Sequence, residues 1–209
     1  MRRLGASACA ALFALGACGE PSDEALLPLA AAAAGPIPAY MPSGALTGAD
    51  TLRVNWFGNA LAAMGEPRLP GYPGEVLRFL WLRTFHRPMV VRLEWRPDGC
   101  LVVLGMLEGR AGEALGAVRK RDSTVTTVDR CDAVRATLHA AGFARATLPP
   151  NARKRDGSEW VFERQGRDGY HVVVRWSPEL SDASRPFAAA GRAFLDLAAW
   201  DQAPDDPIY

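Results

Sequence analysis

Histidine and cysteine are scarce in this chain, which has three histidines and four cysteines among 209 residues. No two histidines, and no histidine and cysteine, lie within five residues of each other, so the local ligand spacing of a zinc site is missing. The chain also lacks a Cys-x-x-Cys pair, a Gly-x-Ser-x-Gly turn and a glycine-rich phosphate loop. We therefore expect no metal and no cofactor, and the sequence assigns no catalytic residue.

Lysine is also nearly absent, since Lys120 and Lys154 are the only lysines among 24 basic residues. These 24 residues face 23 acidic ones, which gives a formal net charge of +1. A balance this close to zero provides no bulk attraction to a phosphate backbone. Nucleic acid is therefore not an expected partner.

A run of apolar residues long enough to span a membrane is missing. The N-terminal run Leu4–Ala17 would measure about 21 Å as a helix, against a hydrocarbon core of roughly 30 Å. Arg2 and Arg3 precede this run and small residues follow it, which is the order of a removable export signal. We interpret residues 1–17 as a signal peptide. Its removal takes two of the 24 basic residues and leaves 22 against 23 acidic ones, a net charge of −1.

Leu15-Gly16-Ala17-Cys18 closes the signal and resembles the lipobox of bacterial lipoproteins, in which a leucine and two small residues precede a lipid-bearing cysteine. The resemblance implies that Cys18 carries a diacylglyceryl group and a further acyl chain such as palmitate, which together anchor the protein to a membrane. Cys9 has no large apolar residue three positions upstream. Gly19 occupies the place where an aspartate often retains such proteins at the inner membrane, so the resemblance favours the outer membrane, facing the periplasm. The alternative is an ordinary secretory peptide, with Cys18 left free or in a disulfide.

The next segment, residues 18–47, is rich in alanine, proline and glycine. We interpret it as a lipid-anchored linker, whose average span as a coil would be about 30 Å. Residues 48–203 are numerous enough to bury the core of one domain. Residues 204–209 form a short tail, and neither a repeat nor a second linker is visible.

Helices are predicted where apolar residues recur every three or four positions, and strands where branched and aromatic residues concentrate or alternate. The predicted helices begin near Thr51, Asp129 and Ser184, and the first has the apolar stripe Leu52, Trp56, Ala60 and Met64. The predicted strands are 75–85, 89–95, 100–107, 123–128, 159–165 and 170–176. This order predicts a single α+β domain with a mainly antiparallel sheet of about five or six strands, packed by two or three helices. The alternation of polar Arg92 and Glu94 with apolar neighbours predicts one buried face and one solvated face.

Two cysteines remain once Cys9 leaves with the signal peptide and Cys18 receives lipid. Cys100 begins a predicted strand, and Cys131 lies on the apolar stripe of the helix expected to pack on that sheet. In an oxidising compartment the two are the natural disulfide pair. The alternative is two separately buried thiols.

Five cationic residues are the candidates for a binding site. His86 ends one predicted strand and His171 opens another, so the candidates would converge if these two strands were neighbours. The candidates are Arg83, His86, Arg87, His171 and Arg175. A cleft of this kind suits a carboxylate, a phosphate or an anionic glycan, because the planar guanidinium binds such groups with two parallel hydrogen bonds. The alternative is a solvated sheet face on which the arginines, Arg78, Arg92 and Arg96 included, pair with Glu94, Glu159 and Glu163.

Two classes of function fit these features. The first is a tethered, non-enzymatic binding or interaction module that presents its sheet face to an envelope protein or a small anionic ligand. The second is an envelope hydrolase or transferase with His171 or His86 as general base, which would require a pocket where histidine meets a carboxylate or a nucleophile. The segments 77–88 and 170–178 resemble parts of uncharacterised bacterial proteins, and that resemblance implies no activity and no site residues.

Overall fold

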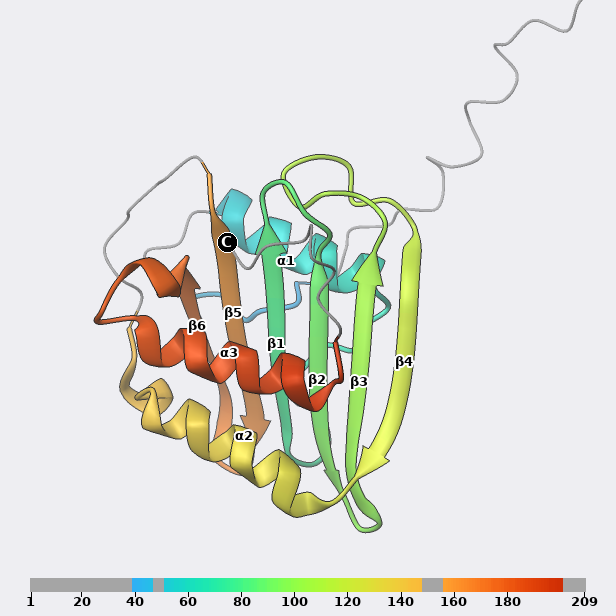
Figure 1. Ribbon diagram of the computed structural model, residues 1–209, viewed down its shortest axis with the longest axis vertical. Coiled ribbons are helices and arrows are strands. Elements are labelled where there is room, and N and C mark those ends of the chain that lie inside the picture. Colours follow the sequence, from blue (N-terminus) through green and yellow to red (C-terminus); the bar gives the residue numbers. More distant parts are fainter. Residues whose placement is uncertain (1–38, 47–50, 148–155, 201–209) are drawn as a thin grey trace, which may run out of the picture. The chain divides into compact units, whose positions relative to one another are not determined.

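The computed structural model describes residues 39–46, 51–147 and 156–200 (Figure 1). The predicted signal peptide, Cys18, most of the predicted linker and the predicted tail lie outside these ranges. The elements in chain order are α1 (Thr51–Ala63), β1 (Val76–Arg83), β2 (Met89–Arg96), β3 (Gly99–Leu107), β4 (Val118–Thr126), α2 (Val128–Ala140), η2 (Phe143–Arg145), β5 (Ser158–Gly166), β6 (Gly169–Trp176), η3 (Pro178–Leu180) and α3 (Arg185–Leu197).

The described strands form one six-stranded antiparallel sheet in the order β4-β3-β2-β1-β5-β6. Strands β1 to β4 follow one another as hairpins, and α2 then returns across the sheet so that β5 lies beside β1. Helices α2 and α3 cover one face and α1 covers the other (Figure 1). The described residues therefore form a single α+β domain, as predicted, and none of their helices is long and apolar enough to cross a bilayer.

The core under α2 and α3 is built from aromatic rings. Phe79 lies 4.9 Å from Phe162 and 5.3 Å from Trp160 between ring centroids, and all three side chains are buried. Helix α3 approaches this cluster at Gly191, where an added Cβ would lie 2.2 Å from the Trp160 ring. The glycine thus lets the helix backbone pack directly on the indole.

The opposite face differs from the sequence-based prediction in two respects. The apolar stripe of α1 is partly wrong, because Leu52 is 81% exposed while Phe57 and Leu61 are fully buried. The domain also begins earlier than residue 48, since Met41 and Leu46 are buried against the core of this face. These two apolar side chains bring the end of the predicted linker into the fold.

The predicted solvated face is wrong for the central strands. Arg92 and Glu94 are each 6% exposed, because the segment that follows α1 covers them. Arg92 Nε donates to Glu66 Oε2 at 2.8 Å, and Tyr72 of the same segment donates to Glu94 Oε1 at 3.0 Å. Arginines of the sheet do pair with glutamates, as the alternative to a binding cleft predicted, but these pairs are buried and not on a solvated face.

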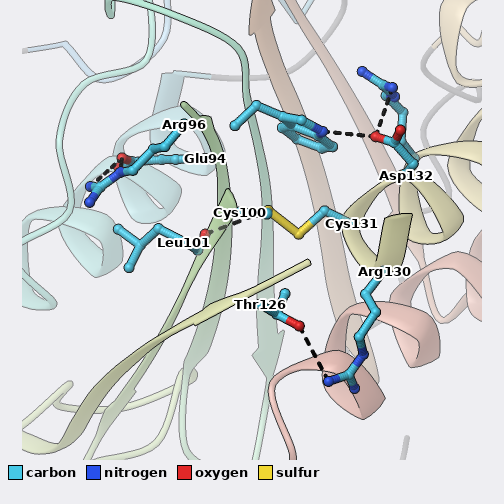
Figure 2. The surroundings of a disulfide bond; sticks show 10 residues. Glu94, Arg96, Cys100, Leu101, Thr126, Arg130, Cys131 and Asp132 are labelled. Carbon is cyan, nitrogen blue, oxygen red and sulfur yellow. Dashed lines mark hydrogen bonds and ion pairs between the residues drawn. A yellow bond between two sulfur atoms is a disulfide. The ribbon is translucent and has the colours of Figure 1, made fainter. Parts of the chain in front are cut away.

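The predicted disulfide is confirmed: Cys100 on β3 is bonded to Cys131 on α2, and both residues are fully buried. Figure 2 shows the bond, with Asp132 next to Cys131. Trp95, the β2 register partner of Cys100, donates its indole N–H to Asp132 Oδ1 at 2.8 Å. The disulfide and this hydrogen bond together hold the N-terminal half of α2 against β2 and β3.

Candidate binding site

The five candidates from the sequence do not converge. Strand β5 lies between β1 and β6, so the two strands that carry the histidines are not neighbours. His171 is level with Leu77 of β1 through Arg164, six positions along the strand from Arg83, which is about 20 Å at roughly 3.3 Å per residue. The expectation that these side chains form one cleft is wrong because it assumed adjacent strands.

Each arginine of this set is engaged within the fold or lies in a turn. Arg83 is fully buried, and its guanidinium carbon lies 4.1 Å from the centroid of the Trp81 ring. Arg175 donates to the carbonyl of Thr147 at 2.9 Å and lies over the ring of Phe187, and burial lowers its pKa. Arg87 is exposed in the turn between β1 and β2. These arginines support the core or the surface, and none of them lines the two hollows described below.

The two histidines lie at opposite ends of the sheet. His86 is half-buried in the β1–β2 turn, where its backbone N–H donates to the carbonyl of Arg83. The Nε2 of His171 lies 2.9 Å from the carbonyl oxygen of Phe143, and its ring contacts the Phe143 ring edge-on. The contact of His171 is therefore with a backbone carbonyl, not with the carboxylate or hydroxyl that would mark it as a general base.

Two adjoining hollows lie instead where β1 begins, next to α2. The first hollow, of about 540 Å³, is lined by Glu75, Leu77, Asp132, Arg135, Ala136, Leu138, His139, Phe143, Ala144 and Arg164. The second hollow, of about 700 Å³, is lined by Tyr72, Gly74, Glu75, Trp95, Arg164, Gln165, Gly166, Arg167 and Asp168. They share Glu75 and Arg164. Sites for small ligands typically measure about 300–1,000 Å³.

Arg135 of α2 organises the wall of the first hollow. Its Nη2 donates to Asp132 Oδ1 at 2.8 Å and its Nη1 donates to Glu75 Oε1 at 3.0 Å. The same guanidinium lies 4.9 Å from the centroid of the Trp95 ring. Because one guanidinium bridges two carboxylates and stacks on an indole, this wall is ordered before any ligand arrives.

Arg164 of β5 is different, because no hydrogen bond reaches its guanidinium from the part of the chain that the structure describes. Its Nη2 lies 3.7 Å from Glu75 Oε1 and 3.5 Å from Asp168 Oδ2, which is ion-pair range without a hydrogen bond. Its Nε is buried and has no partner among these residues. A planar, charged donor therefore lines both hollows without a hydrogen bond to the described residues, although Glu75 and Asp168 lie within ion-pair range of it.

The sequence contains one local signal for this site. Asp132, Arg135 and His139 recur at three- and four-residue spacing, which forms a polar stripe beside the apolar stripe of α2. No local signal identifies Arg164 or Glu75, because only the pairing of β1 with β5 brings them together.

Comparison with known proteins gives no family for this chain. No protein-family model matches it, and a search of curated proteins finds no match.

Proposed function

We propose that this protein is a lipid-anchored protein of the bacterial envelope, tethered at Cys18 to the outer membrane and facing the periplasm, whose domain is a non-enzymatic binding module for an anionic ligand. The ligand would bind in the hollows beside α2. The sheet face expected from the sequence is unsuitable, because helices and the segment after α1 cover its central strands. The alternative, a hydrolase or transferase using His171 or His86, is less well supported, because His171 contacts a backbone carbonyl and neither histidine lines the hollows.

One observation carries this proposal: Arg164 lines both hollows and has no hydrogen bond to its guanidinium from the described residues. A guanidinium binds a carboxylate or phosphate through parallel charge-assisted hydrogen bonds, which are among the strongest polar contacts in proteins. A guanidinium that has no hydrogen bond from the described residues, on a side chain about one-third exposed, can bind such a ligand at its open edge.

The proposal is tested with a small probe, 4-phenylbutyrate, and its uncharged analogue 4-phenylbutanamide. The full chain carrying Cys18→Ser is titrated with each probe by NMR, with the arginine Nε–H signals observed directly. We expect the acid to shift the Arg164 signal and the amide to bind at least roughly tenfold more weakly, because hydrogen bonds to charged groups contribute about 1.5–3 kcal/mol. Arg164→Gln should lose the preference for the acid.

Arg185→Gln is the matched control, because Arg185 is an exposed arginine of α3 that pairs with Asp182 and lines neither hollow. It should bind the acid as the parent chain does. Equal affinity of the acid for the parent chain and for Arg164→Gln would contradict the proposal.

A further inference from the structure

The first hollow offers acceptors as well as a donor. Glu75 accepts hydrogen bonds only at Oε1 and Asp132 only at Oδ1 from the residues that the structure describes, so one oxygen of each carboxylate is unused. The two side chains are 31% and 39% exposed. A ligand that fits must therefore present an anionic group to Arg164 and N–H or O–H donors to Glu75 and Asp132.

The floor of the same hollow is apolar. Leu77, Leu138 and Phe143 line it and are 1%, 2% and 6% exposed. A free phosphate would leave this floor without a contact. A polyanionic glycan would bring further negative charge towards Glu75 and Asp132, which Coulomb repulsion disfavours. The floor instead suits an apolar group attached close to the anion.

We propose that the hollow binds the carboxyl end of a polypeptide with an apolar last residue. This inference rests on the anion-binding function proposed above. The terminal carboxylate would pair with Arg164, the last side chain would cover the floor formed by Leu77, Leu138 and Phe143, and backbone N–H groups would donate to Glu75 and Asp132. A chain end combines one carboxylate, adjacent N–H donors and a side chain within a few ångströms, which matches the three kinds of group in the hollow.

The experiment compares the tetrapeptide acetyl-Gly-Ala-Ala-Phe as the free acid with the same peptide as the amide, and includes glucuronate and inorganic phosphate as competing anions. Affinities are measured by NMR titration on the full chain carrying Cys18→Ser. We expect the acid to bind at least roughly tenfold more tightly than the amide and more tightly than either competing anion. Arg164→Gln should reduce the affinity for the acid peptide to that for the amide peptide. Arg185→Gln should leave both affinities unchanged.

Two further variants separate binding from folding. Arg164→Lys keeps the charge but loses the planar fork, so its preference for the acid should be intermediate. Glu75→Gln should weaken the binding of the acid peptide and of the amide peptide alike, because it replaces a charged acceptor that both peptides use with a neutral one. Unchanged thermal unfolding of each variant shows that the effect lies in the site.

The outcomes distinguish this inference from the function beneath it. If the amide binds as tightly as the acid, or if glucuronate or phosphate binds more tightly than the peptide, the chain-end inference is wrong. If 4-phenylbutyrate depends on Arg164 but the peptide does not bind, the inference is wrong while the anion site stands. If neither probe binds, both proposals are wrong.

Discussion

Arg78 on β1 and Glu163 on β5 are register partners, and both side chains are completely buried. Arg78 donates from Nε and Nη2 to the two oxygens of Glu163 at 2.7 and 2.8 Å, and from Nη1 to the carbonyl of Pro67 at 2.6 Å. Burial lowers the pKa of Arg78, but the charge and hydrogen bonds of Glu163, together with Glu66 and Tyr170, raise it above the ordinary value, so the guanidinium stays charged. Burial and the Glu163 charge also raise the pKa of Tyr170, which donates its hydroxyl to Glu163 at 2.7 Å.

Glu163→Leu is expected to destabilise the domain by about 3–5 kcal/mol, because it removes the carboxylate that accepts two hydrogen bonds from the buried Arg78 and leaves only the more distant Glu66, at 3.7 Å, as a described carboxylate partner. The double variant Arg78→Met/Glu163→Leu should recover most of that loss, since two apolar side chains of similar volume need no compensation for lost hydration. Urea unfolding followed by tryptophan fluorescence measures both. A double variant as unstable as the single one would show that the pair contributes net stability.

At the scale of secondary structure, the sequence predicted α2 better than α1, whose apolar stripe was partly wrong. Cys131, which was expected on the apolar stripe of α2, is buried, and so are Val134 and Leu138 of the same helix. The prediction failed for β4, which was expected at 123–128 and extends over Val118–Thr126. This edge strand is exposed on both faces up to Val125, so no burial imposes an alternation on its sequence.

The candidate site was less predictable because it depends on strand order. Arg164 and Leu77 become neighbours only when the β5–β6 hairpin joins the sheet beside β1. In the sequence, 86 residues lie between them. Local patterns describe the strands but not their order. His86 and His171 were predicted as site residues from their residue type alone, but they lie at opposite ends of the sheet.

The disulfide fixes α2, the helix that carries Asp132 and Arg135 of the first hollow, to β3. Cys100→Ala/Cys131→Ala is expected to lower the free energy of unfolding by about 3–4 kcal/mol, because the bond closes a loop of 31 residues in the unfolded chain. The variant should also bind 4-phenylbutyrate more weakly, because Asp132 follows Cys131 directly and holds the wall of the first hollow. Urea unfolding and the NMR titration measure the two effects.

A reducing agent is the control for the disulfide prediction. It should lower the unfolding midpoint of the parent chain and leave the double variant unchanged. A variant as stable as the oxidised parent would contradict the stabilising role of the bond.

At the scale of the whole molecule, part of the nearly balanced charge lies in the interior and not on the surface. Several charged side chains are buried on the α1 side of the sheet, namely Glu66, Arg78, Arg92, Glu94 and Glu163. These five residues are two cations and three anions, and the partly exposed Arg96 and Arg121 pair with Glu94 and Glu66. The surface that remains has no large excess of either sign, which fits a protein whose attachment to a membrane would come from lipid rather than from charge.

The small number of cysteines limits which residues can carry that lipid. Of the four cysteines, Cys100 and Cys131 are bonded to each other, so only Cys9 and Cys18 remain as acceptors. We expect radiolabelled palmitate to be incorporated into the parent chain in a bacterial host and into Cys9→Ser, and to be absent from Cys18→Ser. The parent chain should fractionate with membranes, because two or more acyl chains at about 0.8 kcal/mol per buried CH₂ make release negligible. Labelling of Cys18→Ser equal to that of the parent would refute the anchor and leave the binding site to be explained in a secreted protein.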